Sequence, residues 1–157
     1  MPPHVVVREV RESDLPVLFE HQSDPEASWM AAHPSRERDA FMIHWAKILA
    51  DDSVTKRAIV LDGEVAGSVV AFSQAGRRMV GYWIGREYWG RGLATAALAA
   101  LLADEPERPL YAYVAKHNLG SIRVLKKNGF QECEGATLGM PLEDDELLLT
   151  LPASEAR

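Results

Sequence analysis

The stretch Ile84-Gly85-Arg86-Glu87-Tyr88-Trp89-Gly90-Arg91-Gly92-Leu93-Ala94-Thr95 links a predicted strand to a predicted helix, and it decides the fold. Its glycines let the backbone turn sharply, so that the first N–H groups of the helix point outward at the positive end of the helix dipole. Such a turn is an anion site, and its small residues let a pyrophosphate approach the main chain. A glycine-containing turn before a core helix explains the same residues, so the turn alone leaves both interpretations open.

The segments around this turn predict a mixed α/β fold. β-Branched runs and turn residues predict strands at 5–10, 57–61, 65–73, 79–85, 110–114, 130–136 and 146–151. Apolar residues at helical spacing predict helices that begin at Ser13 and Ser35, a buried helix over 91–103, and a helix over 118–128 that ends at Gly129. The order β-α-α-β-β-β-α-β-α-β-β predicts an α/β (α+β) sandwich around a mixed sheet. Asp62-Gly63 predicts a tight hairpin turn inside it.

Composition predicts one globular domain over residues 1–157. The chain is 47% hydrophobic and 25% charged, and a domain of this length buries a core without a disulfide or structural metal. Cys133 is the single cysteine, which excludes an intramolecular disulfide framework and a Cys-rich zinc site. Without a long apolar run or a signal-like start, we expect a cytoplasmic protein that does not bind a membrane.

The charge of the chain is uneven. A formal charge of −6 argues against a protein that binds nucleic acid by neutralising phosphates. Residues 77–128 hold nine Lys or Arg and four acids, a net +5, which leaves −11 for the remainder. This division predicts a polyanionic small ligand on one side and a cationic partner on the other. Charges scattered over solvated faces explain it equally well.

Two common phosphate-binding motifs are excluded. A P-loop needs Gly-Lys-Ser or Gly-Lys-Thr, where this chain has Gly92-Leu93-Ala94. A dinucleotide fold needs a third Gly or Ala where Thr95 stands, and an acid near the end of the next strand, where Val114-Ala115-Lys116-His117 has none. A nucleotide kinase and a dinucleotide-dependent oxidoreductase are therefore both disfavoured.

The turn and a second motif resemble those of the GCN5-related N-acetyltransferases (GNAT). Residues 89–94 match the family pattern Gln/Arg-x-x-Gly-x-Gly/Ala with Trp at its first position, and Tyr88 to Gly92 reads as in the ribosomal-protein-type N-terminal acetyltransferases. Asn118, Ser121, Gly129 and Phe130 match the second motif, Asn-x-x-Ser before a helix that ends in Gly-Phe. The resemblance covers nearly the whole chain and implies a mostly antiparallel sheet of six or seven strands with helices on both faces.

The resemblance implies acetyl-CoA, without a metal, in a cleft between strands 79–85 and 110–114. It assigns the pantetheine amides to the main chain of Tyr82, Trp83 and Ile84, and the pantetheine arm to Asn118. It assigns the pyrophosphate to the N–H groups of Trp89, Gly90, Arg91, Gly92, Leu93, Ala94 and Thr95. Lys126 and Arg123 are predicted contacts to the nucleotide phosphates, although solvated charges on a helix explain them as well.

The implied reaction is direct attack of an amine on the thioester, which needs a base for the amine and an acid for the thiolate. The family's Tyr acid falls at Leu125 and its Glu at Met79, so neither familiar side chain is present. Ser121 is then the predicted acid. We expect the acceptor side in the loop between the first two helices, with Glu26 as the base.

Four further residues near that loop, His21, Asp24, Trp29 and His33, are predicted to bind the acceptor. Polar surface residues and core aromatics with no role in binding would give the same sequence pattern. The expected acceptor is a primary amine such as a protein N-terminus, a polyamine or an amine antibiotic. The alternative is an acyl-CoA-binding sensor module of the same fold with little turnover. A monomer and a homodimer are both compatible with the sequence.

Overall fold

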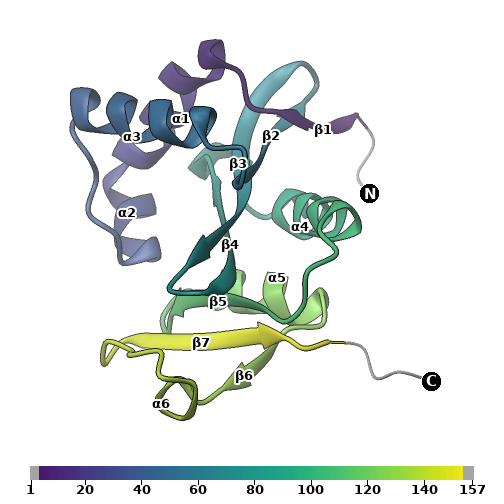
Figure 1. Ribbon diagram of the computed structural model, residues 1–157. Coiled ribbons are helices and arrows are strands. Elements are labelled where there is room, and N and C mark those ends of the chain that lie inside the picture. Colours follow the sequence, from purple (N-terminus) through teal and green to yellow (C-terminus); the bar gives the residue numbers. More distant parts are fainter. Residues whose placement is uncertain (1–3, 154–157) are drawn as a thin grey trace.

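The computed structural model describes residues 4–153, and its strands form one twisted seven-stranded sheet (Figure 1). The strand order is β1-β2-β3-β4-β5-β7-β6, and every neighbouring pair is antiparallel except β4 and β5. The strands are β1 (Val5–Glu9), β2 (Thr55–Leu61), β3 (Glu64–Gln74), β4 (Arg77–Ile84), β5 (Leu110–Ala115), β6 (Gln131–Cys133) and β7 (Glu146–Leu151). The predicted fold class is confirmed.

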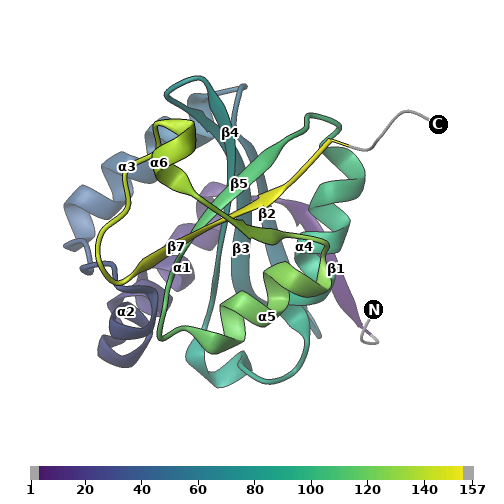
Figure 2. The same cartoon turned by 90° about the horizontal axis from the view of Figure 1, so that it is seen from below.

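The helices cover both faces of this sheet (Figures 1 and 2). One face carries η1 (Glu12–Asp14), α1 (Leu15–Ser23), α2 (Pro25–Ala31) and α3 (Arg38–Ala50). The other carries α4 (Leu93–Asp104) and α5 (Leu119–Lys127), while η2 (Arg86–Tyr88) leads from β4 towards α4 and α6 (Gly135–Leu138) follows β6. Within residues 4–153, none of these helices is long and apolar enough to span a bilayer.

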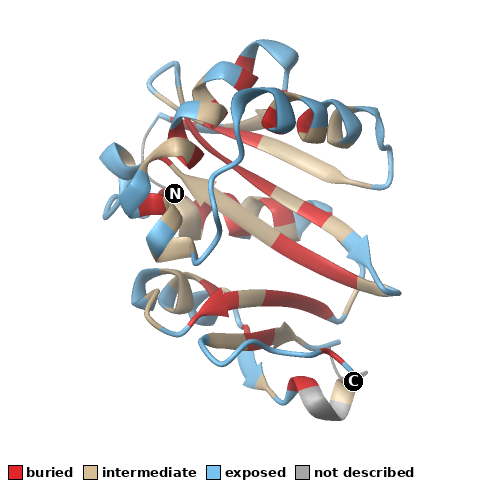
Figure 3. Cartoon of the chain, turned by 90° about the vertical axis from the view of Figure 1, so that its left-hand side faces the viewer, coloured by how far each residue is buried: buried red, intermediate tan, exposed pale blue. Residues whose placement is uncertain are grey.

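The core lies in two layers because adjacent residues of a strand face opposite sides of the sheet. Ile59 packs with Leu98 and Leu101 under α4, whereas its neighbour Ala58 packs with Phe41 and Trp45 under α1 and α3. Figure 3 shows the buried positions running along the strands beneath the helices. The inner face of α4 is fully buried, as the apolar sequence of this helix predicts.

Four predictions about the elements are wrong. Ser13 lies inside η1 and caps no helix, and α3 begins at Arg38 rather than at Ser35. The predicted loop after α1 contains a helix, α2, because the Asp24 carboxylate accepts hydrogen bonds from the N–H groups of its first turn and Pro25 stands at its first position. The predicted strand 130–136 ends at Cys133, where the chain turns into α6.

The parallel contact between β4 and β5 is very short. It consists of the pairs Arg78↔Leu110 and Met79↔Tyr111. The Arg78 side chain is anchored there by a buried ion pair, with its Nε 2.6 Å from Glu105 Oε1. Beyond Met79 the two strands diverge, and this divergence creates the cleft described next.

Candidate functional site

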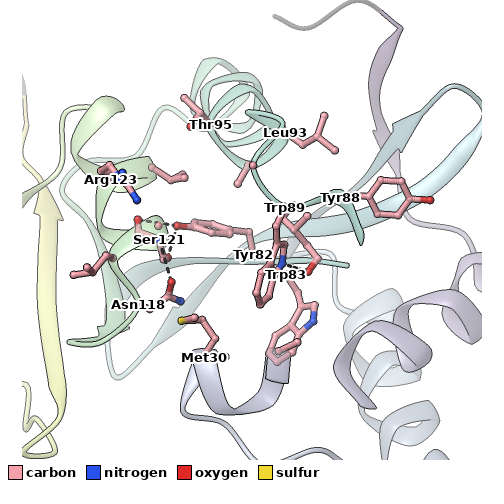
Figure 4. Close-up of a pocket in the computed structure, with 18 of the residues that line it drawn as sticks. Met30, Tyr82, Trp83, Tyr88, Trp89, Leu93, Thr95, Asn118, Ser121 and Arg123 are labelled. Atoms are coloured by element: carbon pink, nitrogen blue, oxygen red, sulfur yellow. Dashed lines mark hydrogen bonds between the residues drawn. The ribbon is translucent and has the colours of Figure 1, made fainter. Parts of the chain in front are cut away.

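A cavity of about 700 Å³ opens where β4 and β5 separate (Figure 4). Its walls come from the end of β4, the turn before α4, the first turns of α4 and α5, and one side of α2. These lining residues include Tyr82, Trp83, Ile84, Trp89, Gly90, Gly92, Leu93, Ala94, Thr95, Asn118, Ser121, Arg123 and Lys127. Most residues that were predicted to hold the cofactor therefore do lie around one cleft.

The open edge of β4 presents main-chain groups to this cleft. The Gly85 N–H donates to the Ala66 carbonyl at 2.9 Å, and the groups of an antiparallel strand alternate sides residue by residue. Tyr82 and Ile84 therefore face the cleft, whereas Trp83 turns its main chain towards β3. The Trp83 main chain is paired with Ser68 of β3, whereas its side chain lines the cavity, and its contact to the ligand stays a prediction.

The Ile84 carbonyl already has a partner. Trp89 Nε1 donates to it at 3.0 Å, so the indole at the first motif position holds the turn against the end of β4. The groups of this edge that stay available are then the N–H of Ile84 and both main-chain groups of Tyr82. Two donors and one acceptor remain at a spacing that suits an extended chain of amides.

The N-terminus of α4 forms the second wall. Gly90 and Gly92 have φ of +77° and +76°, and no atom lies within 4 Å of where a Cβ would stand on either residue. The first helical hydrogen bond runs from the Ala96 N–H to the Gly92 carbonyl at 3.1 Å, and no side chain caps the helix. The N–H groups of Leu93, Ala94 and Thr95 therefore point out of the helix, which makes this end an anion site.

The positive side chains of the cleft differ in part from those predicted. Arg91 does not line it, because its guanidinium lies over the Tyr88 ring, 5.8 Å from the ring centroid. Lys126 is also turned away and pairs with Glu132 at 3.4 Å. Arg123, which was predicted, lines the cleft, and Lys127, which was not predicted, lines it one helical turn away on the same face of α5.

The N-terminus of α5 forms the third wall. Asn118 Oδ1 accepts a hydrogen bond from the Ser121 N–H at 3.1 Å, and its Nδ2 donates none among the described residues. Ser121 Oγ lies 2.5 Å from the Tyr82 hydroxyl, which reaches over from β4 (Figure 4). Burial raises the pKa of Tyr82 to about 12, so this phenol stays protonated at neutral pH.

Three residues predicted for the acceptor side do not reach the cleft. His21 is buried against Gly85, where a Cβ would come within 2.7 Å of its ring, and burial lowers the pKa of His21. Asp24 caps α2 and pairs with Arg86 at 2.8 Å. Glu26 pairs with the same guanidinium at 2.5 Å and is exposed, so the prediction that it is the base has no geometric support.

A second hollow adjoins the cleft on its α2 side. This α2 pocket of about 430 Å³ is lined by Ser28, Trp29, Ala32, His33, Pro34, His117 and Asp145. His117 lines both cavities, its Nε2 lies 2.8 Å from the Trp29 carbonyl, and its ring packs 4.3 Å from the Trp29 ring. Two of the predicted acceptor residues, Trp29 and His33, thus meet here. His117 was not predicted as a site residue, because its partner Trp29 lies 88 residues away in the sequence.

The family model for the acetyltransferase (GNAT) domain matches residues 4–131. The chain belongs to the GNAT acetyltransferase family. It is therefore an acyltransferase by family, and the predicted enzyme class is confirmed. No curated protein matches the sequence.

Solved structures share the GNAT fold at low sequence identity. A GNAT acetyltransferase from Bacillus anthracis has a TM-score of 0.76 at 17% identity, covering 97% of this chain and 96% of that one. Spermidine N-acetyltransferase from Vibrio cholerae, solved with CoA and spermine, has a TM-score of 0.78 at 15% identity, covering 96% of each chain. The aminoglycoside acetyltransferase AAC(6')-Ib, solved with coenzyme A, gives 0.74 at 23%, covering 94% of each chain. Likeness at these identities establishes the fold.

The two positions at which this chain differs from the family pattern, Leu125 and Met79, lie in the core. Leu125 is 1% exposed on the inner face of α5, and Met79 is 2% exposed where β4 meets β5. Neither residue lines the cleft, and neither side chain has a group that could give or take a proton. The acid and base of this enzyme must therefore come from other positions.

Proposed function

We propose that this GNAT domain transfers the acetyl group of acetyl-CoA directly to a primary amine. One observation carries the proposal. The pairing of β4 with β5 stops after two residue pairs, so that a free strand edge leads straight to the uncapped N-terminus of α4. The edge suits the amides of a pantetheine arm, and the helix end suits the pyrophosphate.

The residues that line the cleft match the successive parts of acetyl-CoA, one after another along its length. The free groups of Tyr82 and Ile84 would bind the pantetheine amides, with the Asn118 side-chain N–H donors facing the same arm. The N–H groups at the start of α4 would bind the pyrophosphate. Arg123 and Lys127 are exposed on the neighbouring face of α5 and would add charge near the phosphates.

The bound thioester supplies an activated acetyl carbon, and the chain supplies the proton handling. Ser121 takes the acid role, with its hydroxyl in the cleft at the N-terminus of α5. His117 takes the base role that Glu26 does not fill. Because its Nε2 must donate to the Trp29 carbonyl, its Nδ1 carries the lone pair that accepts a proton from the amine.

The α2 pocket is the proposed entrance for the amine. It meets the cleft at His117, so an amine that enters here passes the base before it reaches the thioester. Trp29 offers an exposed indole face and Asp145 a carboxylate, and both attract an ammonium group. The acceptors in the solved relatives, spermine and an aminoglycoside, are cationic amines, and the ribosomal-type resemblance adds a protein N-terminus.

The first test is thermal unfolding with and without acetyl-CoA. A ligand at 100 times its dissociation constant stabilises by about 2.7 kcal/mol, a rise of roughly 5–11 °C for a chain of this size. Gly92→Glu should abolish the rise, because its carboxylate would stand at the anion site. Gly76→Glu is the matched control, since Gly76 has φ of +78° and an equally open Cβ position on the β3–β4 turn.

The second test measures thiol release from acetyl-CoA with spermine, paromomycin and a peptide with a free N-terminus. Turnover with any of them supports the proposed transfer and assigns the acceptor. A melting shift that Gly92→Glu abolishes, without turnover on any amine, would favour the acyl-CoA-binding module instead. No shift with acetyl-CoA would refute the proposed function.

A further inference from the structure

The Tyr82 side chain bridges the cleft at the place where β4 and β5 have separated. It starts on β4, and its hydroxyl ends 2.5 Å from Ser121 Oγ and 3.1 Å from the Ser121 carbonyl on α5 (Figure 4). This is a direct contact between the strand that would hold the donor and the residue in the acid role. Neither the sequence motifs nor the family match assigns a task to this phenol.

The role of this contact depends on where the hydroxyl hydrogens of Tyr82 and Ser121 point. Tyr82 and Ser121 have one hydroxyl hydrogen each, and at 2.5 Å only one of the two lies between the oxygens. Burial raises the pKa of Tyr82 to about 12, so the phenol keeps its hydrogen at neutral pH. This hydrogen is directed at Ser121, because the Tyr82 O–H also donates to the Ser121 carbonyl at 3.1 Å, and it can be shared with Ser121 Oγ. When the phenol donates to Ser121 Oγ, the Ser121 hydrogen is released to point into the cleft.

The backbone of Ser121 is held independently. Its N–H donates to the Asn118 side chain at 3.1 Å, so the first turn of α5 fixes the Cα while Tyr82 fixes the hydroxyl. A serine hydroxyl without such a partner rotates among three staggered positions. The bridge therefore selects one orientation of the group in the acid role.

We propose that Tyr82 is a positioning residue, which directs the Ser121 O–H at the sulfur of the leaving CoA. This inference rests on the proposed acetyl transfer. In that step the amine nitrogen bonds to the acetyl carbon, the C–S bond breaks, and its electron pair goes to the sulfur. The Ser121 O–H donates a hydrogen bond to this sulfur and keeps its proton. One proton passes from the nitrogen to His117, so CoA leaves as a thiolate beside an imidazolium, and this proton then returns from His117 through solvent to complete the thiol.

The direct test uses CoA itself and needs no acceptor. A directed hydroxyl stabilises the thiolate, so the thiol of bound CoA should have a lower pKa than free CoA, measured from the ultraviolet absorbance of the thiolate across a pH series. Tyr82→Phe and Ser121→Ala should both raise that pKa. Tyr82→Phe/Ser121→Ala should raise it no further than Ser121→Ala alone, because Tyr82 acts through Ser121.

Tyr113→Phe is the matched control. Tyr113 lies on β5, packs near Met79 and Met140, and does not line the cleft, so its loss of a hydroxyl should leave the thiol pKa unchanged. With an amine that turns over, Tyr82→Phe should lower kcat by about 10- to 100-fold and change KM for acetyl-CoA by less than about threefold.

The outcomes separate the two proposals. If CoA gives no melting shift with the unmodified protein, the proposed function fails. If CoA binds but Tyr82→Phe leaves both the thiol pKa and kcat unchanged, the proposed function stands and the role of Tyr82 is refuted. An additional loss from Tyr82→Phe in the Ser121→Ala background would also refute it, because the phenol would then act on the ligand directly.

Discussion

Glu105→Ala should destabilise this domain strongly, because it leaves the buried Arg78 guanidinium without its counter-ion. Both side chains are 8% exposed, and Arg78 Nε lies 2.6 Å from Glu105 Oε1. Thr55 Oγ1 also donates to this carboxylate at 3.2 Å, so one substitution removes two hydrogen bonds. Arg78 would keep its bond to the Ser53 carbonyl at 2.8 Å.

The expected loss is about 3–5 kcal/mol, the usual cost of breaking a buried ion pair. For a chain of this length the melting temperature should fall by roughly 6–20 °C. Urea unfolding with linear extrapolation measures the loss directly. The exposed Glu107→Ala, two residues further along, is the control and should change stability by less than about 0.5 kcal/mol.

A double variant tests the reasoning. Arg78→Met/Glu105→Leu removes both charges and fills the space, so it should recover stability to within about 1 kcal/mol of the native chain. A double variant as unstable as Glu105→Ala would refute the argument from an unpaired buried charge. A cost below about 1 kcal/mol for Glu105→Ala would refute it as well. Because Arg78 pairs with Leu110 at the base of the cleft, acetyl-CoA should also shift the melting temperature of Glu105→Ala less.

Three further changes have defined outcomes. Gly67→Ala should lose about 1–3 kcal/mol in urea unfolding, because its Cβ would overlap a β4 carbonyl, whereas Gly81→Ala meets its first atom at 3.8 Å and should be tolerated. Lys127→Ala should weaken acetyl-CoA binding about fivefold by calorimetry while Lys126→Ala, outside the cleft, leaves it unchanged. Burial lowers the pKa of His21, so below about pH 6.5 the unfolded chain binds more protons than the folded chain, and stability falls as the pH falls. The melting temperature of His21→Phe should therefore change less between about pH 7.5 and 5.5 than that of the native chain.

Local signals predicted the backbone well where a single residue dictates its own conformation. Asp62 and Gly63 adopt the positive φ that their hairpin turn requires, and Gly129 ends α5 at φ of +92°. Asn118 caps the N-terminus of the same helix. Location in the cytoplasm and the oligomeric state stay predictions, since they depend on features outside one folded chain.

Side-chain roles were predicted less well, because they depend on which way an element is turned. Lys126 and Lys127 differ by one position on α5, about 100° of rotation, and the direction of the sheet decides which of them reaches the cleft. Glu26 was predicted as a base from its place in a loop. The loop is a helix, and Arg86 from η2 engages the carboxylate.

The sequence by itself determined the glycine turn, the buried helix behind it and the capped α5, because φ preferences, capping and apolar spacing act within a few residues. Only the tertiary structure decided that Tyr82 meets Ser121, 39 residues away, and that His117 meets Trp29, 88 residues away. Such contacts depend on how far β4 and β5 diverge and how α2 packs beside β5. The divergence of the two strands and the position of α2 are set by the packing of the whole core, to which every buried side chain contributes.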